Sequence, residues 1–148
     1  MAVRRARLSL HRLGASHLYS TETGEQRLLT NPPIEEIGDT SPAVSPYGRT
    51  LVCSRVSPDF DNVTLWLLHL GEGYKPLGKE EKVQTGNVTN IGAAWLPDGS
   101  EFVFSSGTGT NFGLWLSAVS SGAIPKKVLR GLTFHEQVQE LWLHSLRQ

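Results

Sequence analysis

The feature that most constrains this fold is a segment that occurs twice in the chain. Its copies cover residues 41–55 and 92–106. In each copy a short turn with proline and glycine is followed by an apolar run. Self-similarity at a spacing of about 50 residues is typical of repeat architectures, which predicts the fold class before any single residue is considered. Three matched pairs stand 51 positions apart: Ala43 and Ala94, Pro46 and Pro97, Gly48 and Gly99.

The composition agrees with a repetitive β fold. Fifteen glycines and eight prolines indicate many turns and therefore many short strands, and 39% hydrophobic residues can support a core. The formal net charge is zero, so the overall charge does not favour nucleic acid or an anionic surface as a partner. Four arginines fall in the first twelve residues, and we interpret residues 1–13 as a basic, solvated segment.

Short apolar runs between turn residues predict strands grouped into units. Residues 51–53 and 102–104 are consecutive apolar residues, which indicates strands covered on both faces. The leucines at 8, 10 and 13 fit either a strand or a poor helix. We divide the rest into a partial unit at 14–36 and whole units at 37–86 and 87–132. The predicted strands are 16–20, 26–30, 43–44, 50–54, 63–70, 74–77, 91–95, 101–105, 114–119 and 126–129.

Four short antiparallel strands in a unit of roughly 40–50 residues are typical of a β-propeller blade. Ser-Pro-x-x-Ser-Pro-Tyr-Gly at 41–48 and Ala-x-Leu-Pro-Asp-Gly at 94–99 each precede an apolar strand and then Leu-Trp-Leu. These motifs resemble the WD-repeat-like blades of TolB-type propellers. Similar blades occur in relatives of prolyl oligopeptidase and dipeptidyl peptidase IV, and in some bacterial winged-helix regulators. Tyr47 replaces the usual Asp of this family and Leu96 its usual Ser, so we expect Tyr47 to lose a side-chain hydrogen bond that closes the turn.

The resemblance implies an all-β fold, namely a partial β-propeller of about two and a half four-stranded antiparallel blades. Closed propellers have about four to eight blades. Three explanations stay open: the chain is a fragment of a longer TolB-like protein, it closes a ring as a homo-oligomer, or it forms an open stack capped by its termini.

Residues 133–148 have a helical pattern. Thr133 and Glu136 fit a capping box. Apolar residues then follow at helical spacing, which predicts an amphipathic helix over 134–146. The alternative is a truncated blade, because Leu-Trp-Leu occurs again at 141–143.

A search for catalytic chemistry finds no recognisable constellation. The chain has no Gly-x-Ser-x-Gly motif and no pair of histidines with zinc-site spacing. Cys53, the single cysteine, reads as a small buried residue. We interpret Glu80 and Glu81 as solvated loop charges. We interpret Trp66, Trp95 and Trp115 as core residues between blades. We therefore predict no catalytic, cofactor-binding or metal-binding residues.

We expect recognition at the loops that join the strands, because a rigid scaffold presents variable loops. The loops considered are 31–39, 56–62 and 107–113. The expected partner is a protein or peptide, with no nucleic acid contacted by the blades. The candidate binding residues are Asp59, Asp61, Asn62, Asn111 and Phe112.

The function that we predict is that of a non-catalytic binding or scaffold module. The resemblance leaves two alternatives: the gating propeller of a prolyl oligopeptidase-type serine peptidase that lacks its catalytic domain, and the sensor propeller of a winged-helix regulator. No run approaches the roughly 18 apolar residues of a membrane span. Residues 1–20 lack a signal peptide's apolar stretch, so we expect a cytoplasmic location by default, or a periplasmic one within a longer exported protein.

Overall fold

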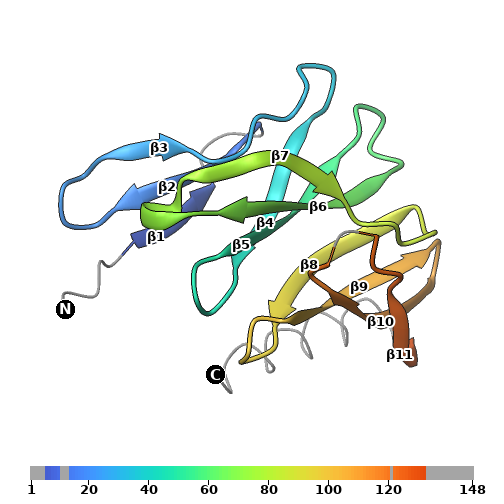
Figure 1. The fold of residues 1–148 in the computed structure, drawn as a ribbon. Coiled ribbons are helices and arrows are strands. Elements are labelled where there is room, and N and C mark those ends of the chain that lie inside the picture. The colour runs from blue at the N-terminus through green and yellow to red at the C-terminus, as the bar shows by residue number, and fades with distance from the viewer. Residues whose placement is uncertain (1–5, 11–13, 121, 133–148) are drawn as a thin grey trace.

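The computed structural model describes residues 6–10, 14–120 and 122–132, and strands dominate this part of the chain (Figure 1). It contains eleven strands and one short 3-10 turn, η1 (Glu72–Tyr74), so the predicted all-β fold class is confirmed. The helix expected over 134–146 falls in residues 133–148, outside the described residues.

The strands form one three-stranded sheet followed by two four-stranded antiparallel units. The first sheet settles the open question for Leu8 and Leu10, because residues 6–10 form a strand that pairs with the next one, whereas residue 13 lies outside the described residues. One parallel pair, Val63 with Thr89, links the two larger units. The first sheet contains β1 (Ala6–Leu10), β2 (Ser16–Ser20) and β3 (Gln26–Leu28); the second unit contains β4 (Gly38–Val44), β5 (Thr50–Val56), β6 (Val63–Leu70) and β7 (Pro76–Lys82); the third contains β8 (Thr89–Trp95), β9 (Glu101–Thr108), β10 (Asn111–Ala118) and β11 (Lys126–Leu132).

The sequence repeat is also a repeat of backbone conformation. Gly48 and Gly99 each have φ of +68°, in turns that join the first two strands of their units. Ser41 and Gly92, also 51 positions apart, have φ of +49° and +65°, and each lies at a bulge in the first strand of its unit. The two larger units are therefore built to the same plan, down to the positions that need a left-handed backbone.

The two equivalent turns are closed by different side chains. In the first turn Ser45 Oγ accepts hydrogen bonds from the backbone N–H groups of residues 49–50, at 3.1 and 3.0 Å. In the second turn the Asp98 carboxylate accepts from the backbone N–H of Ser100 at 3.0 Å and from its hydroxyl at 2.8 Å. Tyr47 has no carboxylate with which to close the first turn, as Asp98 closes the second. The Ser45 hydroxyl closes the first turn instead.

Consecutive apolar residues of β5 belong to two separate core clusters. Leu51 packs with Leu29 of the first unit, whereas Val52 packs with Phe102 and Phe104 of the third. The middle unit is therefore covered on both faces, as the sequence predicts, and Leu51 and Val52 each contribute buried apolar area to one of the two interfaces.

The predicted tryptophan core is confirmed for Trp95 and for Trp115, which packs against the same buried cluster, whereas Trp66 belongs to neither core cluster. Trp95 is buried, lies 5.3 Å from the Phe102 ring, and donates its indole N–H to the carbonyl of Ala43 at 3.1 Å. Trp66 and Trp115 are only partly buried, because Trp66 covers a charged side chain and Trp115 lies beside Lys127.

The expectation of a loop at 107–113 is wrong. Strands β9 and β10 continue to Thr108 and from Asn111, which leaves a two-residue turn at 109–110. A Cβ at Gly107 would lie 2.3 Å from the carbonyl oxygen of Asn111 and 2.7 Å from Cα of Phe112. The glycine therefore marks a close approach of two strands rather than a flexible loop.

A candidate binding rim

Four connections lie at the same end of the strands, because alternate connections of an antiparallel meander meet at one edge. We call them the loop rim, and they comprise residues 29–37, 57–62, 83–88 and 109–110. The first two protrude beside one another at the top of Figure 1. Their bases are joined where the backbone N–H of Ile37 donates to the carbonyl of Val56 at 3.0 Å.

The turn at 57–62 is held by its own hydrogen bonds. The backbone N–H groups of Ser57 and Phe60 donate to the carbonyls of Asn62 and Ser57, at 2.9 and 3.0 Å. The Ser57 hydroxyl donates to the Asp59 carboxylate, which also accepts from the backbone N–H of Asp61 at 3.1 Å. The backbone N–H of Asn62 donates to Ser57 Oγ at 3.0 Å. The turn is therefore locally fixed rather than shaped by its neighbours.

Three of the five predicted binding residues come together in this turn. Asp59, Asp61 and Asn62 are all exposed, but the Asp59 carboxylate is engaged within the turn. The hydrogen bond from the Ser57 hydroxyl lowers the pKa of Asp59 below its ordinary value, so the side chain stays ionised. Asp59 thus shapes the turn, whereas the exposed Asp61 carboxylate faces solvent on the rim.

The other two predicted residues lie at the start of β10, after the turn at 109–110. Asn111 is exposed, whereas Phe112 is only 9% exposed and belongs to the packed interior. The structure therefore places both at the rim end of the third unit, with the Phe112 ring turned away from solvent.

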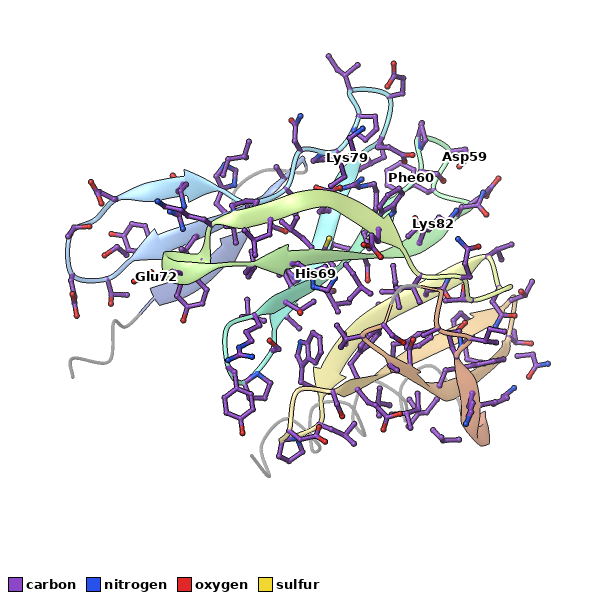
Figure 2. The ribbon with its side chains drawn as sticks, in the orientation of Figure 1. Asp59, Phe60, His69, Glu72, Lys79 and Lys82 are labelled. Atoms are coloured by element: carbon purple, nitrogen blue, oxygen red, sulfur yellow. The ribbon has the colours of Figure 1, made fainter. Side chains whose placement is uncertain are left out.

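The two most exposed apolar side chains on the rim were missed by sequence reasoning. Ile34 is 96% exposed in the first loop and Phe60 is 68% exposed in the second. Figure 2 shows Phe60 and Asp59 on the same protruding turn. The signal available in the sequence is the placement of each apolar residue among prolines and carboxylates, where it has no strand neighbours to pack against.

A shallow groove of about 610 Å³ lies beside the first loop. Its apolar wall comes from Pro32, Pro33, Ile34 and Ile37, and polar side chains from the first sheet and the loop face it. These polar residues are His17, Gln26, Asn31 and Glu36. A few polar groups among apolar walls are the common form of a ligand-binding groove, and the volume falls in the range of about 300–1,000 Å³.

A buried charge cluster fixes the first loop to the scaffold. Arg55 contacts Asp39 through two hydrogen bonds, at 2.6 and 3.0 Å, and Glu80 through one at 2.5 Å. The guanidinium also lies 4.6 Å from the centre of the Trp66 ring. The second oxygen of Glu80 accepts from the backbone N–H of Asn31 at 3.1 Å. The interpretation of Glu80 as a solvated loop charge is therefore wrong, because it joins β5, β7 and the rim.

Protonation states in this cluster follow from its contacts. Burial alone would lower the pKa of Arg55, but the hydrogen bonds and charges of Asp39 and Glu80 outweigh it and raise that pKa. Burial raises the pKa of the Cys53 thiol, and the negative charge of Asp39 adds to the effect. Cys53 is buried and protonated, which confirms its interpretation as a small core residue.

Among the described residues, no three His, Cys, Asp or Glu side chains gather closely enough to hold a metal ion. Within the same ranges, no helix combines the length and apolar content that crossing a bilayer requires.

Comparisons with known proteins bear on the fold. No protein-family model and no curated protein matches the sequence. A solved TolB structure from Agrobacterium tumefaciens is similar with a TM-score of 0.60 at 14% sequence identity, over 86% of this chain and 47% of that chain. TolB from Acinetobacter baumannii gives a TM-score of 0.38 at 12% identity, over 84% of this chain and 40% of that chain.

The first of these likenesses shows a TolB-like β-propeller fold. The two larger units correspond to four-stranded blades, and the chain spans less than half the length of the TolB structures that it matches.

Proposed function

We propose that this chain is a non-catalytic β-propeller module that binds a protein or peptide partner through the loop rim. The observation that carries the proposal is the exposure of Ile34 and Phe60, at 96% and 68%, on loops fixed by hydrogen bonds. Large apolar side chains held rigidly in solvent are suited to act as interface anchors, because little conformational entropy is lost on binding.

The module is proposed to work as part of a larger propeller. Support comes from its size, since two four-stranded units and one three-stranded sheet fall short of the roughly four blades of the smallest closed rings. We propose blades at 37–86 and 87–132 and a partial blade at 14–36, to which β1 adds a further strand. Further blades of a longer chain, or other copies, would complete the ring.

Site-specific photo-cross-linking tests the proposed rim. A photoreactive phenylalanine analogue is placed at position 60 in one variant and at position 47 in another, in the cells from which the chain comes. Position 47 is the matched control for position 60. Tyr47 and Phe60 are 70% and 68% exposed and lie at opposite ends of the strands.

We expect a discrete cross-linked protein from position 60 and none from position 47. Cross-linking from position 47 alone would place the interaction on the opposite turns and contradict the proposed rim. The absence of a protein adduct from both positions would contradict the binding function.

A further inference from the structure

We infer that Phe60 is the anchor of the loop rim, and that its partner is a basic protein segment with apolar side chains. This inference rests on the proposed function and adds the chemistry of the partner. It draws on the backbone conformation of Phe60, the charge of the two protruding loops, and the exposure of Ile34.

The backbone of Phe60 is strained without a packing reason. Three described non-glycine residues have positive φ: Ser41, Phe60 and Tyr74, at +49°, +61° and +60°. Ser41 lies in a strand bulge, and the partly buried Tyr74 packs against the second core cluster. Phe60 has φ of +61° and is 68% exposed, so burial does not offset its strain. Strain of this kind persists at binding sites, where it fixes a side chain in its working position.

The surrounding turn holds Phe60 in this conformation before any partner arrives. The hydrogen bonds from Ser57, Asp61 and Asn62 to groups within the turn fix the backbone around Phe60, whose ring remains exposed. An aromatic anchor that is already ordered loses little rotational freedom on binding, and such residues dominate interface energies.

The charge of the two protruding loops selects the partner. They contain four carboxylates, Glu35 and Glu36 in one and Asp59 and Asp61 in the other, and no basic residue. The neighbouring segment 79–82 adds two lysines and two glutamates, with no net charge. Figure 2 shows Lys79 and Lys82 on this strand. The rim therefore keeps a negative balance that complements lysine and arginine.

Ile34 on the first loop offers a second apolar contact, because its side chain is 96% exposed. Glu36 lies two residues further along the same loop and provides a negative charge there. A segment with apolar residues for Phe60 and Ile34, and a basic residue for Glu36, satisfies both features at once.

Selection from a random peptide library displayed on phage tests this inference. The bait is the full chain, and the matched bait carries Phe60→Asn. Asparagine tolerates positive φ, so this substitution removes the ring while relieving the strained backbone. Tyr47→Ser serves as the control for loss of an exposed aromatic at the opposite end.

We expect the wild-type chain and the Tyr47→Ser chain to enrich the same peptides, with lysine or arginine next to leucine, isoleucine or phenylalanine. Their affinity should fall about 30-fold or more with Phe60→Asn, the size of a binding hot spot, and should weaken as salt is raised. The melting temperature of Phe60→Asn should equal or exceed that of the wild type, which separates lost binding from lost folding.

Three results would overturn the inference. They are enrichment of acidic or uncharged peptides, equal enrichment by the Phe60→Asn bait, and no enrichment above background. Cross-linking at position 60 to a cellular protein that lacks a basic apolar segment would also reject this partner chemistry, while the proposed interaction function would stand.

Discussion

At the scale of single residues, the least replaceable side chain is Arg55. Its side chain is 3% exposed and that of Asp39 is fully buried. A buried ion pair adds little net stability over apolar packing, yet removing one partner leaves an uncompensated charge in the interior. Arg55 is therefore important because its loss would leave the buried Asp39 carboxylate without a counter-charge.

Arg55→Ala should lower the free energy of unfolding by about 3–5 kcal/mol, since Asp39 would remain buried without its partner. Urea unfolding at neutral pH measures this loss. Arg49→Ala is the control, because Arg49 is exposed and a surface charge contributes less than about 0.5 kcal/mol. Equal effects of both substitutions would show that the cluster carries no special stability.

This cluster could not be predicted from the sequence, because it depends on strand register. Asp39 lies directly opposite Arg55 in the pairing of β4 with β5, beyond a bulge that the sequence does not reveal. Glu80 reaches the same arginine from β7, which begins later and runs further than the strand predicted at 74–77. Phe60 was missed for a related reason, since exposure in a loop is a property of the folded chain.

At the scale of elements, the strand order was predictable, because turn chemistry is local. Proline and glycine at fixed positions mark the turns, and consecutive apolar residues mark strands covered on both faces. The loop at 107–113 was not predictable in the same way. Glycines and threonines there are compatible with a loop or a strand, and the close approach at Gly107 is decided by the opposite strand.

The two equivalent glycines should respond differently to substitution. Both have φ of +68°, so alanine is strained at either position. A Cβ at Gly48 would lie 2.9 Å from the Tyr74 ring, whereas at Gly99 the nearest atom is at 3.5 Å. We expect Gly99→Ala to cost about 1 kcal/mol and Gly48→Ala about 2 kcal/mol in unfolding experiments. The opposite order would contradict the described packing of Tyr74.

The second turn should be sensitive to acid, because it is closed by a carboxylate. The backbone N–H and the hydroxyl of Ser100 lower the pKa of Asp98 below its ordinary value of 3.8. The ionised form is favoured in the folded state, so its contribution is complete above the ordinary pKa and is lost as pH falls through the lowered one.

We therefore expect the difference in free energy of unfolding between wild type and Asp98→Ala to be constant at neutral pH. The difference should disappear as the pH falls below 3.8. Unfolding curves over a pH series measure it. Asp59 titrates in both proteins, so its contribution cancels in the difference. A difference that persists unchanged at the lowest pH would show that the carboxylate does not close this turn.

At the scale of the whole molecule, the first sheet carries exposed apolar residues on one face. Tyr19 and Leu28 are 39% and 47% exposed, whereas Leu18 packs against the second core cluster. We expect this face to contact a further blade or another copy, so light scattering of the isolated chain should show self-association that Leu28→Lys reduces. A monomer at all concentrations would exclude closure of the ring by identical copies.

The loop rim, rather than the opposite turns, is the part of the molecule that we propose carries the interaction. Hydroxyl-radical footprinting of the chain, with and without the partner recovered by cross-linking, tests it directly on side chains of comparable exposure. Ile34 and Phe60 represent the rim, and Tyr47 and Leu77 represent the opposite end, at 96%, 68%, 70% and 55% exposure. We predict that the partner protects Ile34 and Phe60 and leaves Tyr47 and Leu77 reactive. Protection of Tyr47 and Leu77 alone would show that the interaction lies at the opposite end of the strands.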